Sequence, residues 1–168
     1  MMTRRSLATF SIAAVGSAFS QRVMQMQTAL DEPLRSEFLL DFTLETQPPK
    51  TIRLLGGDRV IVGISGGTFQ GPKLKGVVMS PGGDWIVRRP DGSSVLDVRV
   101  VFVTDDGESI YVSWRGIAYT AEGGSLHARI LPMFETGSTK YHWLNNVVSV
   151  GVYRRTVGTV AYRVHQIL

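Results

Sequence analysis

The 168-residue chain contains no cysteine, which excludes disulfide bonds, thiol nucleophiles and thiolate metal sites. Histidine is scarce: His127, His142 and His165 lie far apart and form neither an HxH nor an HExxH pattern. The glycine-rich block at residues 66–76 has neither the P-loop ending nor the Rossmann spacing. The sequence therefore predicts no metal and no other cofactor.

Long hydrophobic runs and a strong charge of one sign are also missing. The uncharged run at residues 8–20 is shorter than the ~20 residues of a membrane-spanning helix, so we expect no stable membrane span. The net charge of +4 falls to +2 without Arg4 and Arg5. Aromatic residues do not alternate with a basic stripe, and we expect no nucleic-acid partner.

The N-terminus has the pattern of an export signal. Two arginines, Arg4 and Arg5, precede the short apolar run and small residues near Ala18, which is typical of a twin-arginine signal over residues 1–20. Residues 21–36 then form a linker or one short helix that ends at Pro33. This interpretation places the mature chain in the periplasm or outside the cell. The alternative is a frayed amphipathic helix on a cytoplasmic protein.

The rest of the chain, residues 37–168, alternates between apolar strands and turn residues. No stretch of helical length with a 3.6-residue period follows residue 36. Many short strands in one small domain predict an all-β fold, an antiparallel closed barrel of about 8–10 strands or, alternatively, a sandwich. The expected strands are residues 38–46, 59–65, 74–79, 85–89, 95–104, 110–118, 126–134, 143–154 and 159–166.

Four ordered blocks carry a family resemblance. They are the run from Gly66 to Gly76, and residues 84–92, 97–116 and 134–145. Together they resemble the DUF3237 family, also called UPF0311, from about Glu37 to the C-terminus. The resemblance implies a small β-barrel and assigns no general biochemical activity.

One predicted hairpin places polar side chains on a common face. Residues two apart in a strand share a face, so Asp97 and Arg99 project together, as do Tyr111, Ser113 and Arg115. If the two faces coincide and point into the lumen, Arg115 would bind an oxyanion or carboxylate and Asp97 would move protons. The alternative is a solvated outer face with cross-strand ion pairs.

A second group lies around a glycine-containing turn. Tyr141, Trp143 and Asn145 share one alternation parity, with Glu135 nearby. An aromatic wall with one amide and one carboxylate suits a small apolar ligand that carries a carbonyl or hydroxyl. The alternative assigns Tyr141 and Trp143 to the core, and Glu135 and Asn145 to the turn.

Two classes of function follow from these groups. The first is an enzyme doing cofactor-free isomerase, lyase or cyclase chemistry on a small, mostly apolar molecule. In it Asp97 or Glu135 is the base, Tyr111 the proton donor, and Arg115 with Asn145 the oxyanion binders; Arg99, Tyr141 and Trp143 contact the ligand. The second is a non-catalytic binder or carrier that uses the same lumen. A homodimer is a further expectation.

Overall fold

The computed structural model describes residues 33–168. The chain divides into two units, Met1–Leu34 and Arg35–Leu168, and the second is described below. The expected signal at residues 1–20 and most of the expected linker at 21–36 lie outside the described residues, so export stays a prediction. Among residues 33–168, no helix combines the length and the hydropathy needed to cross a membrane.

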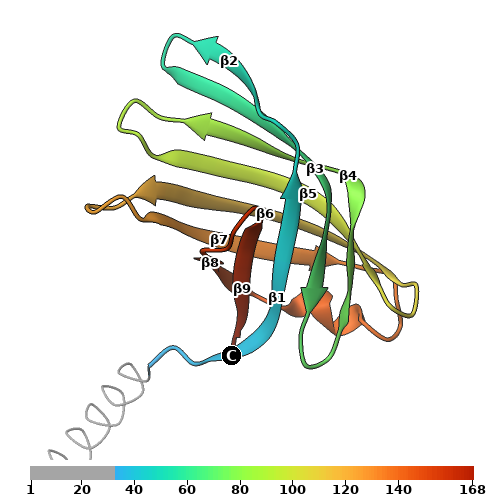
Figure 1. The fold of residues 1–168 in the computed structure, drawn as a ribbon. Coiled ribbons are helices and arrows are strands. Elements are labelled where there is room, and N and C mark those ends of the chain that lie inside the picture. Colours follow the sequence, from blue (N-terminus) through green and yellow to red (C-terminus); the bar gives the residue numbers. More distant parts are fainter. Residues whose placement is uncertain (1–32) are drawn as a thin grey trace, which may run out of the picture. The chain divides into compact units, whose positions relative to one another are not determined.

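Nine antiparallel strands form one sheet that closes on itself (Figure 1). The pairing of β1 with β3 closes an eight-stranded barrel, and β2 is the extra strand, so the predicted antiparallel barrel is confirmed. The strands are β1 (Ser36–Thr46), β2 (Lys50–Leu54), β3 (Gly57–Gln70), β4 (Lys75–Arg88), β5 (Ser94–Thr104), β6 (Ser109–Thr120), β7 (Leu126–Glu135), β8 (Ser149–Arg154) and β9 (Val160–Ile167).

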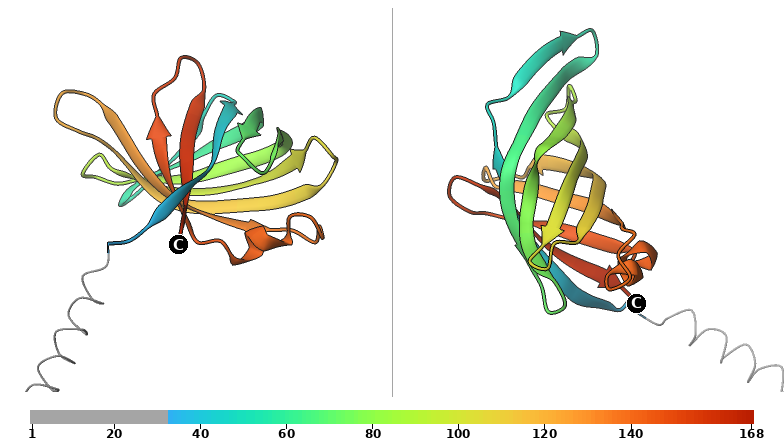
Figure 2. Two further views of the ribbon diagram at one scale, coloured as in Figure 1. Left: turned by 90° about the horizontal axis from the view of Figure 1, so that it is seen from below. Right: turned by 90° about the vertical axis from the view of Figure 1, so that its right-hand side faces the viewer.

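The strands β1 and β2 both run along β3, one after the other. The first pairs with residues 64–70 of β3 and the second with residues 57–61. Pro48 and Pro49 separate them, because proline has no N–H for the ladder. All five residues of β2 are exposed, and the sequence analysis did not identify this strand. It lies at the end of the barrel away from the short 3-10 helix η1 (His142–Asn146) (Figures 1 and 2).

Two glycine segments at which expected strands end lie within longer, continuous strands. Gly66-Gly67 and Pro81-Gly82-Gly83 lie inside β3 and β4, where the strand register shifts between Ile64 and Thr68 and between Met79 and Gly83. Gly67 has φ +144°, and a Cβ there would collide with the Thr43 carbonyl oxygen. These segments are therefore bulges that bend continuous strands, and β4 replaces the two strands expected at 74–79 and 85–89.

The strand expected at residues 143–154 is also wrong in its first half. A 3-10 helix, η1 (His142–Asn146), precedes β8. Its residue Leu144 is fully buried, and Tyr141 just before it is buried as well. Phe69 and Phe102 stack in the same core, with ring centroids 4.5 Å apart. Apolar side chains thus fill the half of the barrel near η1.

Candidate active site

The other half of the barrel encloses a cavity of about 290 Å³. Its walls come from the end of β1 and from β3, β4, β5, β6 and β9, and most of the surface is aliphatic. The polar side chains that line it are Thr46, Gln47, Asp84, Trp114 and Tyr162. Such a concave apolar site with a few polar groups suits a small, mostly apolar ligand.

Asp84 brings the single carboxylate among the residues that line this cavity. It lies on β4 directly after the bulge, and its side chain is half-buried. Burial raises the pKa of the Asp84 carboxyl to about 6, and the nearby Asp97 charge adds to this. The Asp97 backbone N–H donates to Asp84 Oδ1 at 3.1 Å, which opposes the rise in pKa but does not cancel it. A carboxyl with this pKa can both accept and release a proton near neutral pH.

The raised pKa of Asp84 predicts a pH-dependent penalty on folding. The unfolded carboxyl ionises near its ordinary pKa of 3.8 and the folded one near 6, so wild-type stability falls as pH rises through this window. The amide side chain of the Asp84→Asn variant does not ionise. Relative to wild type, we expect the variant to gain about 1–3 kcal/mol of unfolding free energy between pH 4 and pH 7.5. Urea titrations of both proteins at the two pH values measure this; an unchanged difference would contradict the assignment.

Two aromatic side chains, Trp114 and Tyr162, line the same cavity as Asp84. Tyr162 is buried, and this burial, followed by the Asp84 charge, raises the pKa of its hydroxyl, which therefore stays protonated. Trp114 is 2% exposed, and its indole Nε1–H is buried without a hydrogen-bond partner among the described residues. Phe42 packs on both rings, at centroid distances of 5.2 Å to Trp114 and 5.3 Å to Tyr162.

The polar hairpin face that the sequence predicts exists, but it is outside the barrel. Asp97 pairs with Arg115 across β5 and β6, so the two faces do coincide. Arg115 is 78% exposed, and Arg99 and Tyr111 are exposed too. The Asp97 carboxylate forms two ion pairs: Oδ1 lies 3.3 Å from Arg99 Nη2, and Oδ2 lies 3.9 Å from Arg115 Nη2. The prediction that these groups lie in the lumen is therefore wrong. The apolar side chains that alternate with them along β5 and β6 point inward and fill the core instead.

An outer groove is lined by all the residues of that hairpin face and also by Glu135. It is lined by Asp97, Arg99, Tyr111, Arg115 and Glu135, together with Ser113, Trp114, Leu131 and Met133. Glu135 lies opposite Tyr111 on the neighbouring strand β7 and is exposed. The structure therefore brings these five predicted residues together in a groove separate from Asp84, and their catalytic roles stay predictions.

The second predicted group does not form one wall. The parity argument is wrong because Trp143 and Asn145 lie in a 3-10 helix rather than a strand. The Asn145 side chain binds the backbone of Thr136, accepting from its N–H at 2.8 Å and donating to its carbonyl at 3.0 Å. Trp143 is half-buried, with the Lys73 Nζ 5.0 Å from its ring centroid. These contacts hold a loop in place, as the alternative expectation has it.

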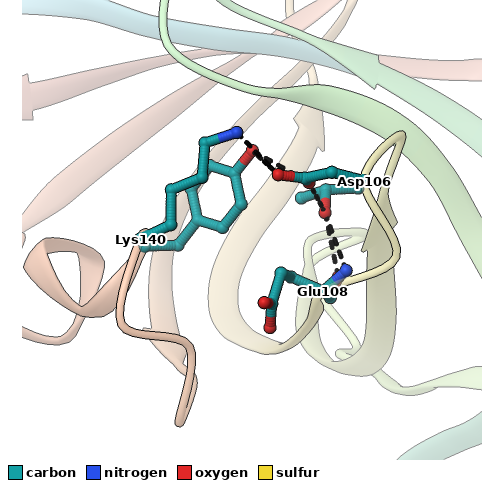
Figure 3. Close-up of polar contacts among 5 residues, drawn as sticks. Asp106, Glu108 and Lys140 are labelled. Atoms are coloured by element: carbon teal, nitrogen blue, oxygen red, sulfur yellow. Dashed lines mark hydrogen bonds and ion pairs between the residues drawn. The ribbon is translucent and has the colours of Figure 1, made fainter.

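Tyr141 belongs to a polar cluster between the β5–β6 turn and the segment before η1 (Figure 3). Its hydroxyl donates to Asp106 Oδ1 at 3.1 Å, and Lys140 Nζ donates to Asp106 Oδ2 at 2.6 Å. Lys140 first, and then Thr104, hold the pKa of the Asp106 carboxyl far below its ordinary value. Every member thus has a partner, which identifies the cluster as a brace between two loops.

The sequence analysis missed Asp84, Trp114 and Tyr162. One signal was present for Asp84, which lies two positions before Ile86 and so shares the face of an apolar residue. The expected strands at 74–79 and 85–89 leave Asp84 outside both of them, which concealed this relation. Among residues 33–168, no three histidine, aspartate or glutamate side chains come together in a metal-binding group.

Comparison with known proteins gives a consistent family relation. The profile of the family described as "Protein of unknown function (DUF3237)" matches residues 34–167. A UPF0311 protein of Rhodopseudomonas palustris is 31% identical over an alignment of 150 residues that covers 75% of this chain and 98% of that protein. The hydroalkoxylation enzyme phnH of Penicillium herquei is 29% identical over 148 residues, covering 87% of this chain and 84% of the enzyme.

Solved structures agree with the fold. A β-barrel-like protein of Acinetobacter baumannii superposes with a TM-score of 0.74 at 31% identity, covering 82% of this chain and 98% of the other. An enzyme of Penicillium herquei superposes with a TM-score of 0.69 at 26% identity, covering 82% and 96%. The barrel is thus common to bacterial and fungal relatives.

Proposed function

Since this chain belongs to the DUF3237 family, whose barrel it shares, we propose that the lumen cavity is its ligand-binding and active site. The cavity binds a small, mostly apolar molecule, and Asp84 performs cofactor-free acid–base chemistry on it. The observation that carries the proposal is the position of Asp84, half-buried among aliphatic side chains with a pKa of about 6. Such a group is matched to proton transfer near neutral pH.

The reaction class is proton transfer at a carbon next to a carbonyl group. The Asp84 carboxylate removes the proton, the C–H electron pair forms a carbon–carbon double bond, and the carbonyl π pair moves to oxygen. Trp114 Nε1–H and the Tyr162 hydroxyl are two of the donors that line the same cavity, and they can stabilise that oxygen. Asp84 then returns the proton to carbon, at the same or another position, so that no electrons enter or leave the substrate.

One relative supports a catalytic role. The Penicillium herquei relative is named a hydroalkoxylation enzyme. Hydroalkoxylation adds an O–H group across a carbon–carbon double bond, which relocates a proton without net oxidation or reduction. Asp84 supplies the kind of group that such chemistry needs. For this chain we therefore favour isomerisation or cyclisation over carriage of an unchanged ligand.

Exchange of α-protons tests this function on a defined probe. We expect 2-tetralone to bind the full chain, and its α-protons to exchange with D2O faster than in buffer alone, as followed by ¹H NMR. Binding without faster exchange would contradict catalysis and identify a carrier. Failure of 2-tetralone and of the hydrocarbon tetralin to bind would contradict the lumen as a ligand site.

A further inference from the structure

The indole N–H of Trp114 is a hydrogen-bond donor for which residues 33–168 supply no acceptor. Trp114 lies on β6 with its ring in the lumen, against Phe42 and Tyr162. Its Nε1 is buried and has no hydrogen-bond partner among residues 33–168. A buried donor left unsatisfied destabilises the fold, and such groups in folded proteins are few. A ligand oxygen in the adjoining cavity would satisfy it.

The charge of the cavity further restricts which chemical class of ligand it can bind. Among residues 33–168, the side chains that line it include one carboxylate, Asp84, and no lysine, arginine or histidine. An anionic ligand would therefore meet a half-buried negative charge without a compensating cation. Most of the remaining wall is aliphatic, from residues such as Ile86 and Val98. The charge of the cavity thus disfavours an anionic ligand, and its mostly apolar wall favours an uncharged molecule over a cation.

We propose that Trp114 determines specificity by donating its indole N–H to the oxygen of a neutral carbonyl compound. This proposal rests on the lumen being the ligand site, as proposed above. Indole is a donor only, so the ligand must supply the acceptor. A carbonyl oxygen does so without adding a donor of its own, and its second lone pair is available to the Tyr162 hydroxyl. The substrate class is therefore a small, mostly apolar ketone or related carbonyl compound.

A matched ligand pair tests the role of the donor. 2-Tetralone and tetralin share one ring skeleton, and only the first carries an acceptor oxygen. Trp114→Phe is expected to weaken 2-tetralone binding by about 5- to 100-fold beyond any change in tetralin binding, as measured by calorimetry on the full chain. Trp85→Phe is the matched control, because Trp85 is 37% exposed and absent from the cavity lining; it should change neither affinity.

The outcomes separate this inference from the proposed function. If Trp114→Phe weakens both ligands equally, the indole donor is unused and the inference is overturned, while ligand binding in the lumen stands. If 2-tetralone binds but its α-protons do not exchange faster than in buffer, the inference of carbonyl specificity is retained and the proposal of catalysis is contradicted. A second measurement needs only the wild-type protein: 2-tetralone should bind at least about tenfold more tightly than the anion 2-naphthoate at pH 7.5. Equal affinities would overturn the inference even if Trp114→Phe did not fold.

Discussion

Asp84→Asn is expected to slow the α-proton exchange of bound 2-tetralone by roughly 10²- to 10⁴-fold. The amide keeps the size of the side chain, and its oxygen can still accept from the Asp97 N–H, so the cavity should keep its shape. The amide cannot take a proton from carbon at neutral pH. Affinity for 2-tetralone should therefore change by less than about threefold while exchange is lost. NMR exchange rates and calorimetry on the same samples measure both quantities.

Asp97→Asn is the matched control for this prediction. The Asp97 carboxylate lies on the outer face with Arg99 and Arg115, and only its backbone N–H contacts Asp84. Its charge contributes to the raised pKa of Asp84, so a small change in the pH profile is expected, with exchange within about threefold of wild type. If Asp97→Asn abolished exchange and Asp84→Asn did not, the catalytic group would lie in the outer groove.

Phe102→Ala is expected to lower the unfolding free energy by about 3–5 kcal/mol. Phe102 is 0% exposed and stacks on Phe69 in the half of the barrel that η1 adjoins. Removing the ring leaves a void that the surrounding strands cannot fill without breaking the closed ladder. Urea unfolding at pH 7.5 measures the change.

Phe38→Ala provides the comparison for that measurement. Phe38 is 39% exposed on β1, with the Arg163 guanidinium carbon 5.0 Å from its ring centroid. Its removal should cost about 1 kcal/mol or less, because water already reaches the ring. Equal losses for Phe38→Ala and Phe102→Ala would contradict the location of the core.

The alternation of β5 and β6 shows how far sequence reasoning reaches. Asp97 and Arg99 share one face, and Val98 and Val100 share the other, as the spacing predicts. The choice of the inner face follows from energetics, since a filled barrel interior favours valine over ion pairs. The alternative of a solvent-exposed outer face with cross-strand pairs is the one that the structure confirms.

Local irregularities in the backbone, a bulge in β4 and the 3-10 helix η1, are the reason why the sequence did not predict the remaining site residues. Gly82 and Gly83 have the composition of a turn, and only their pairing with β3, and that of Gly83 with β5, shows that β4 continues through them. That continuation turns Asp84 toward the lumen. Likewise, the spacing predicts that Trp143 and Asn145 share a face, because alternate residues of a strand do so. They lie in a 3-10 helix, where this rule does not hold. Candidate sites built on alternation are therefore dependable only inside uninterrupted strands.

The indole ¹⁵N–¹H spectrum tests the central claim, that the lumen beside Asp84 and Trp114 is the ligand site. The chain has three tryptophans, so three indole signals are expected, and Trp114→Phe assigns one of them. Titration with 2-tetralone should move the Trp114 signal downfield with saturation, as the N–H gains an acceptor, and leave the signals of Trp85 and Trp143 in place. A saturable shift confined to Trp85 or Trp143, with the Trp114 signal unmoved, would contradict the account.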